Sequence, residues 1–174
     1  MLNVPNILTI IRLLLVGVFY YVFNLPDHMA ALAVFLLAGA TDIVDGYIAR
    51  KYNQITDLGK LLDPIADKLL LIVALFCLYG AGKVPLMFPV LAASKEAVMV
   101  IGGAFLLTKE NKVVYSKTIG KVAAAVFFAG VVVSFFSPQV APYHAVLLTA
   151  GLSLSFAAMV VYGYTNVLKG RRKK

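Results

Sequence analysis

Apolar stretches alternate with short polar breaks along the whole chain, and this pattern predicts six helices. The stretches cover about residues 7–24, 29–49, 61–80, 85–107, 119–137 and 143–167. Each is close to the roughly 20 apolar residues that a helix needs to cross the hydrocarbon core of a bilayer. No repeat or linker divides them. The pattern predicts an all-α membrane protein with six transmembrane helices, built as a single domain over residues 1–174.

The composition supports a membrane protein. Residues of the types AVILMFWYC make up 61% of the chain and charged residues only 14%, with a mean hydropathy of +0.91. A soluble domain is about half apolar and one-quarter charged. The composition therefore excludes a water-soluble globule, a disordered tail and a nucleic-acid-binding module. The single cysteine, Cys77, also excludes a disulfide framework and a cysteine metal site.

The basic residues gather at one set of helix ends. The chain has 16 Lys and Arg against 8 Asp and Glu, and the opposite loops carry Lys83 alone. By the positive-inside rule, both termini and the charged connections 50–60 and 108–118 face the cytoplasm. The basic residues counted on that side are Arg12, Arg50, Lys51, Lys60, Lys109, Lys112, Lys117, Lys121, Lys169, Arg171, Arg172, Lys173 and Lys174.

Four aspartates lie inside otherwise apolar helical sequence. Asp42 and Asp45 are three residues apart and Asp63 and Asp67 are four apart, so each pair lies on one face of its predicted helix. The two helices are consecutive, and both pairs lie within about three turns of the connection that joins them. A carboxylate near hydrocarbon costs several kcal/mol, so such residues usually face an internal polar cavity and carry function.

Four carboxylates that converge from two antiparallel helices need compensating charge, because like charges at close range repel one another. Two divalent cations would balance them, and oxygen ligands suit Mg²⁺ or Mn²⁺ better than Zn²⁺. A pair of such ions stabilises the attacking and leaving oxygens of a phosphoryl substitution. The alternative is that some of these aspartates cap helices or pair with Lys60 and Lys68.

The spacing of these residues resembles a known signature. Residues 42–67 read Asp42-x2-Asp45-Gly46-x2-Ala49-Arg50-x8-Gly59-x3-Asp63-x3-Asp67. This pattern resembles the signature of the CDP-alcohol phosphatidyltransferases at every fixed position. The opening segment, with Asn6, Thr9 and Arg12, and the six-span layout are also similar to that family.

The resemblance implies a transferase that displaces CMP from CDP-diacylglycerol with an alcohol, using two divalent cations, Mg²⁺ or Mn²⁺. It implies that Asp42, Asp45, Asp63 and Asp67 bind metal, and that Asp67 is also the general base. It further implies a homodimer in the lipid bilayer of a bacterial inner membrane, with the active site facing the cytoplasm. The residues implied to bind the CDP-lipid are Asn6, Gly46, Ala49, Arg50, Thr56 and Gly59.

The acceptor alcohol is less sharply indicated. The opening segment and residues 59–68 look most like phosphatidylglycerophosphate synthases, whose acceptor is glycerol 3-phosphate, and next like cardiolipin synthases, whose acceptor is phosphatidylglycerol. A phosphate on the acceptor needs cationic partners, for which the candidates are Lys95, Lys117 and Lys121. The chain departs from the first pattern, because Lys95-Glu96 stands where those synthases have Arg-Glu, and residues 116–121 only approximate their Gly-Lys-x-Lys-Thr. An ion pair with Glu96 is the alternative for Lys95, and a topological role is the alternative for the other two lysines.

Two other functions fit part of the pattern. A divalent-cation carrier would also need carboxylates within the membrane, but carriers usually bind near the midplane between related repeats. Here the aspartates lie near the cytoplasmic ends of their predicted helices, which favours the enzyme over the carrier. A catalytically silent scaffold is the third possibility, and the intact motif argues against it.

Overall fold

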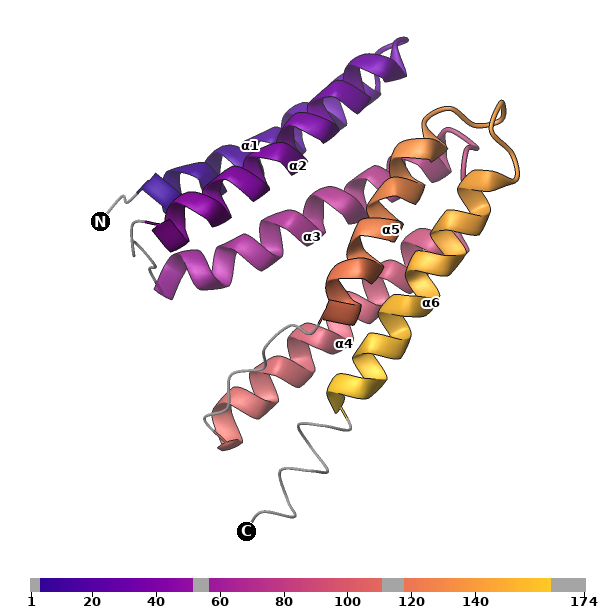
Figure 1. The fold of residues 1–174 in the computed structure, drawn as a ribbon. Coiled ribbons are helices and arrows are strands. Elements are labelled where there is room, and N and C mark those ends of the chain that lie inside the picture. The colour runs from indigo at the N-terminus through magenta and orange to yellow at the C-terminus, as the bar shows by residue number, and fades with distance from the viewer. Residues whose placement is uncertain (1–3, 52–56, 111–117, 164–174) are drawn as a thin grey trace. The chain divides into compact units, whose positions relative to one another are not determined.

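The computed structural model describes residues 4–51, 57–110 and 118–163, with side chains placed for residues 10–41, 68–102 and 119–161. This part of the chain forms helices and contains no strand, which confirms the predicted all-α class (Figure 1). Most helix ends lie within about one turn of their predicted positions. The helices are α1 (Val4–Phe23), α2 (His28–Lys51), α3 (Asp57–Gly80), α4 (Met87–Glu110), α5 (Thr118–Ser134) and α6 (Tyr143–Gly163).

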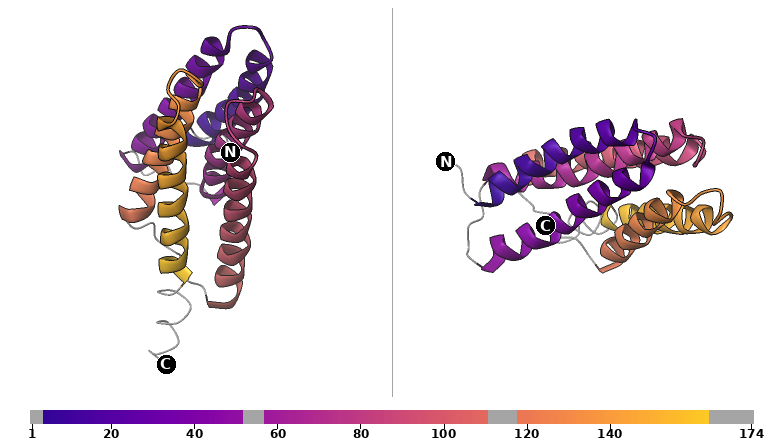
Figure 2. Two further views of the ribbon diagram at one scale, coloured as in Figure 1. Left: turned by 90° about the vertical axis from the view of Figure 1, so that its right-hand side faces the viewer. Right: turned by 90° about the horizontal axis from the view of Figure 1, so that it is seen from above.

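The helices belong to two compact units, Met1–Gly82 and Lys83–Lys174. In the first unit α1 packs against both α2 and α3, and in the second α5 runs along α6 while α4 also contacts α6 (Figure 2). The first unit ends in a turn whose backbone is left-handed at Gly82, with φ of 69°. A residue without a Cβ is suited to this conformation. The prediction of a single domain stays a prediction.

The interior of the first unit between α1 and α2 is made by one stripe of side chains from each helix. The stripes follow the spacing of four and three residues that keeps side chains on one helix face. The rings of Phe19 and Phe35, both fully buried, have centroids 6.0 Å apart and fix the register of the two helices. The stripe of α1 is Arg12, Val16, Phe19 and Phe23, and that of α2 includes Ala31, Phe35 and Ala38.

The third helix contributes a stripe with the same spacing. Its buried side chains include Leu70, Ala74 and Leu78, which are four residues apart along the helix. Because α1 packs against both α2 and α3, the first unit has an apolar interior toward the ends of α1 and α3 and the start of α2. This interior aligns the three helices that carry the aspartate motif and the opening segment.

In the second unit, two glycines allow α5 and α6 to approach closely. A Cβ built on Gly151 would lie 2.6 Å from the Cα of Phe127, and one on Gly130 would lie 2.9 Å from the backbone nitrogen of Leu148. Contacts below about 3 Å are not tolerated between such atoms, so both positions require glycine for this packing. The backbones of α5 and α6 therefore approach closely at these two glycines.

Lys83, the basic residue of the loop between α3 and α4, has a specific place in the second unit. Its Nζ donates a hydrogen bond to the carbonyl oxygen of Phe135, at 2.5 Å, directly after the last residue of α5. A cation at a helix C-terminus is favoured by the helix dipole and by the unsatisfied carbonyls there. Burial lowers the pKa of Lys83, and the carbonyl compensates part of the lost hydration. Lys83 thus caps α5.

Within the residues whose side chains are placed, one helical segment is long and apolar enough to cross a membrane, namely Tyr143–Val161. Four shorter apolar helical segments accompany it: Ile10–Phe23, His28–Thr41, Lys68–Gly80 and Ile119–Ser134. The prediction that all six helices cross the membrane stays a prediction.

Replacing Gly151 with alanine should destabilise the packing of α5 on α6, because the added methyl group would meet the backbone of Phe127. Overpacking of this kind costs about 1–3 kcal/mol, measured as a lower Tm of the purified protein in detergent. Gly102→Ala is the matched control, since a Cβ there meets no atom within 4 Å and α4 gains a better helix former. Equal Tm values for the two variants would contradict the described contact.

Candidate active site

The four motif aspartates occupy backbone positions near helix ends that are joined by one connection. Asp42 and Asp45 lie in the last three turns of α2, and Asp63 and Asp67 in the first three turns of α3. At 1.5 Å of rise per residue, Asp45 is about 9 Å from the end of α2 and Asp63 about 9 Å from the start of α3. The other two lie about 14–15 Å from these ends. The two pairs therefore occupy matching depths along their helices.

The same positions continue the buried stripes of their helices. On α2, positions 42 and 45 follow Ala31, Phe35 and Ala38 with the spacing of four, three, four and three residues. On α3, positions 63 and 67 precede Leu70, Ala74 and Leu78 with a similar spacing. Residues so spaced share one face of a helix. The sequence motif thus falls on the two faces that form the interior of the first unit further along. The side chains of residues 42–67 lie outside the described part.

Arg12 is the charged residue that the structure adds to this picture. The charge pattern counted it among the basic residues at the cytoplasmic border, but its side chain is only 1% exposed and lies on the buried stripe of α1. It follows Val16 and Phe19 toward the start of α1 at the spacing of that stripe. That spacing is visible in the sequence and puts Arg12 on the helix face of Val16 and Phe19, but which face of α1 is buried depends on the helices that it meets.

The positions implied to bind the CDP-lipid gather at the same end of the first unit. Asn6 is in the first turn of α1, Gly46, Ala49 and Arg50 are in the last turns of α2, and Gly59 is in the first turn of α3. Figure 1 shows the start of α1, the end of α2 and the start of α3 at one end of this unit. Thr56 and the side chains of the other five residues lie outside the described part.

The three lysines proposed for the acceptor belong to the second unit. Lys95, in α4, forms an ion pair with the carboxylate of the adjacent Glu96, and the two side chains are 18% and 17% exposed. The ion pair that was the alternative interpretation of Lys95 is therefore present. Lys121 lies in the first turn of α5 with an exposed side chain, and Lys117 lies outside the described residues.

The donor chemistry of the four aspartate positions suits hard divalent cations. No group of three or more His, Cys, Asp or Glu side chains that could hold a metal occurs among the side chains that the structure places, and the four aspartates are not among them. Four positions that can offer carboxylate oxygens stand at one end of two neighbouring helices. Such oxygens are the ligands that Mg²⁺ and Mn²⁺ prefer. The residues present therefore fit the implied cations.

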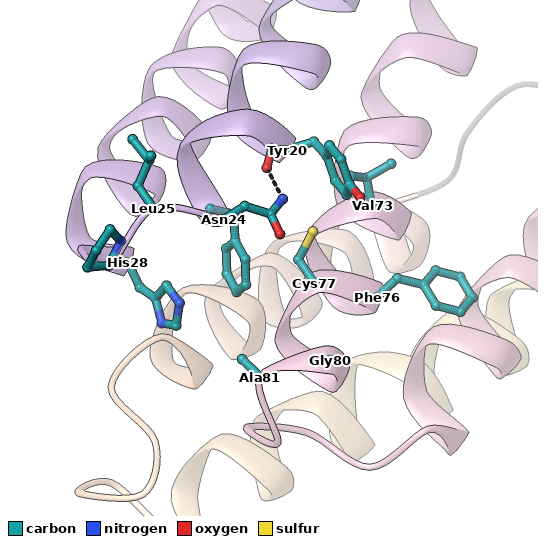
Figure 3. Close-up of a pocket in the computed structure, with 11 residues that line it drawn as sticks. Tyr20, Asn24, Leu25, His28, Val73, Phe76, Cys77, Gly80 and Ala81 are labelled. Atoms are coloured by element: carbon teal, nitrogen blue, oxygen red, sulfur yellow. Dashed lines mark hydrogen bonds between the residues drawn. The ribbon is translucent and has the colours of Figure 1, made fainter.

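The first unit also contains a cavity of about 790 Å³ at its opposite end, where α1 and α3 end and α2 begins (Figure 3). Two of its polar lining residues, Asn24 and His28, make contacts within the hairpin of α1 and α2. The side-chain nitrogen of Asn24 donates to the carbonyl oxygen of Tyr20 at 2.7 Å, and the His28 ring stacks on Phe23 with centroids 4.5 Å apart. None of the residues that line this cavity is among those implied to bind metal, the CDP-lipid or the acceptor.

Comparison with known protein families finds a match that includes the aspartate motif. The family model described as CDP-alcohol phosphatidyltransferase matches residues 2–161 of the chain. This range includes the opening segment, the aspartate motif and most of α6. The match therefore extends over both compact units.

Several bacterial proteins named CDP-diacylglycerol–glycerol-3-phosphate 3-phosphatidyltransferase are similar to the chain. The protein of Bacillus subtilis is 34% identical over 137 residues, which cover 70% of each chain. That of Cereibacter sphaeroides is 38% identical over 141 residues, 74% of this chain and 64% of the relative.

The protein of Pseudomonas fluorescens is 49% identical over 80 residues, 44% of this chain, and the match spans only 41% of that relative. The similarity is thus strongest over part of the length, whereas the family model covers nearly the whole chain. Together with the 34% identity over 70% of the Bacillus protein, this coverage shows that the chain belongs to the CDP-alcohol phosphatidyltransferase family.

Proposed function

We propose that the protein transfers the phosphatidyl group of CDP-diacylglycerol to the hydroxyl of glycerol 3-phosphate, releasing CMP and forming phosphatidylglycerophosphate. The observation that carries this proposal is that the four aspartate positions continue the spacing of the buried stripes of α2 and α3, at matching distances from the ends of their helices. Bacterial proteins similar to the chain are named CDP-diacylglycerol–glycerol-3-phosphate 3-phosphatidyltransferase. Family membership favours a transferase over a cation carrier.

In this proposal Asp42, Asp45, Asp63 and Asp67 hold two divalent cations, Mg²⁺ or Mn²⁺. When bound, such ions neutralise the diphosphate and stabilise the charge that develops on the attacking and leaving oxygens. The carboxylates of this chain supply the negative charge and the oxygen donors for them. An uncompensated cluster of four carboxylates at the end of an apolar interior would be strongly unfavourable.

The bond changes are those of a direct substitution at phosphorus. The acceptor oxygen forms a bond to the phosphorus of the phosphatidyl group, and the bond from that phosphorus to the oxygen of CMP breaks. Asp67 accepts the proton of the attacking hydroxyl, as a general base within hydrogen-bond reach of it. CMP leaves with the bonding electron pair, and no covalent enzyme intermediate is required.

The remaining residues bind and orient the substrates. Arg50 would hold a phosphate of the donor through its planar fork of donors, and Gly46 and Gly59 would leave room for close approach of the nucleotide. Asn6, Ala49 and Thr56 complete the proposed CDP-lipid contacts. Lys95, Lys117 and Lys121 are proposed for the acceptor phosphate, with Lys95 exchanging its carboxylate partner Glu96 for that phosphate.

We further propose that the protein is a homodimer in the bacterial inner membrane, with all six helices spanning it and both termini in the cytoplasm. The asymmetry of Lys and Arg supports this orientation. The diacyl tails of the donor would stay in the bilayer while its diphosphate meets the aspartates near the inner surface. Such a location fits a water-soluble acceptor and a water-soluble leaving group.

Replacing Asp67 with asparagine should lower CMP release at least about 10²–10⁴-fold, the contribution of a general base, because the amide cannot accept the proton. The measurement is CMP release from CDP-diacylglycerol with glycerol 3-phosphate and Mg²⁺. Asp27→Asn is the matched control, since Asp27 is an exposed carboxylate at the other end of the first unit that accepts a hydrogen bond from the Met29 amide. Undiminished turnover by Asp67→Asn would refute the assigned base.

The acceptor is tested by offering the purified enzyme glycerol 3-phosphate, phosphatidylglycerol, inositol phosphate or serine with CDP-diacylglycerol. We expect a product of the mass of phosphatidylglycerophosphate with the first acceptor, and loss of all CMP release when divalent cations are chelated. Cardiolipin formed from phosphatidylglycerol would instead assign the acceptor class of the cardiolipin synthases. CMP release that survives chelation would contradict the metal requirement.

The orientation is tested with single cysteines in a Cys77→Ser background. Gln139→Cys lies in the exposed turn between α5 and α6 and should react with a membrane-impermeant maleimide in intact cells. Arg172→Cys in the tail should react only after the cells are permeabilised. The reverse pattern would show that the termini face outward.

A further inference from the structure

We propose that Arg12 is a positioning residue of the aspartate site, whose guanidinium holds a carboxylate of α2 in the orientation that binds metal. This inference rests on the proposed function, because it assigns to Arg12 a role toward the proposed cations. It concerns a residue that the charge pattern had placed at the membrane border.

The register of α1 and α2 places Arg12 opposite position 42. Phe19 of α1 and Phe35 of α2 face each other with ring centroids 6.0 Å apart. Arg12 is seven residues before Phe19 and position 42 is seven residues after Phe35, and the helices are antiparallel. Seven residues make nearly two full turns, with a drift of only about 20°. Both positions therefore advance by about 10 Å toward the same end and stay on the facing sides.

The burial of Arg12 requires an anionic neighbourhood. Its side chain is 1% exposed and is the bulkiest of the fully buried side chains that the structure places. A guanidinium stays protonated in proteins, and a buried charge is tolerated only when it is paired and hydrogen-bonded. The acidic residues of the first unit outside the motif are Asp27, in the opposite loop, and Asp57, at the very start of α3. The motif aspartates are the carboxylates at the depth of Arg12.

The chemistry of arginine suits this role. Its planar fork donates two parallel hydrogen bonds to one carboxylate, which fixes the plane of the carboxylate as well as its position. A partner that orients a metal ligand typically changes metal affinity about 10–100-fold when it is removed. A simple nearby cation acts in the opposite direction, because removing its repulsion would tighten the binding of a divalent ion. The sign of the change therefore separates the two roles.

The test is Mn²⁺ binding to the purified full-length protein without substrate, followed by the electron paramagnetic resonance signal of free Mn²⁺. Arg12→Met keeps the length of the side chain and removes its charge and its donors, and we expect Mn²⁺ affinity to fall about 10–100-fold. Arg12→Lys keeps the charge but lacks the planar fork, so a smaller loss is expected. The matched control is Val16→Ala, the next residue of the same buried stripe, which should lower the Tm and leave Mn²⁺ affinity unchanged.

Unchanged or tighter Mn²⁺ binding by folded Arg12→Met would overturn the positioning role. If that variant does not fold, Arg12→Lys decides the question, and an affinity equal to that of the unaltered protein would overturn the role. An equal loss of Mn²⁺ affinity in Val16→Ala would show that the loss in Arg12→Met comes from disturbed packing, and it would also overturn the positioning role. Absence of Mn²⁺ binding by the unaltered protein is a distinct outcome, because it removes the proposed metal site itself.

Discussion

The organising constraint of the first unit is that the buried Arg12 and the positions of the motif aspartates continue the helix faces that form an apolar interior. The stripes of α1, α2 and α3 are apolar where the aromatic rings of Phe19 and Phe35 meet, and they become charged toward the end that carries the motif. Charges in such a place persist only with counter-charges. In the proposed site, the four carboxylates, the buried Arg12 and the two cations would depend on one another, because each would supply charge that the others need.

Packing in the apolar part of this unit fixes the register of α2 against α1, and these helices also carry the charged residues. Small residues such as Ala31 and Ala38 let α2 lie close to α1, and the ring of Phe35 sets how far one helix is displaced along the other. A shift of one residue would rotate positions 42 and 45 by about 100° away from the interior stripe. Packing far from the motif thus controls whether its residues can act together.

The second unit shows a different means of holding helices together. Gly130 and Gly151 bring the backbones of α5 and α6 into contact, and Lys83 caps the C-terminus of α5. The ion pair of Lys95 and Glu96 adds a polar pair within α4. A lysine whose charge is matched by a neighbouring carboxylate is tolerated in a largely apolar helix.

The sequence alone predicted the helices and led to the proposed reacting groups, because apolar runs of helical length and a fixed spacing of aspartates are local properties of the chain. It also showed Lys83 as an exception to the charge asymmetry, but not that this lysine caps α5, since Lys83 and Phe135 are far apart in sequence. The contacts that bury Arg12 could not be predicted from the sequence for the same reason. Its place on one face of α1 is readable from the sequence, whereas its burial depends on which helices α1 meets. Only the tertiary structure decided that, because burial is a property of neighbours brought together by packing.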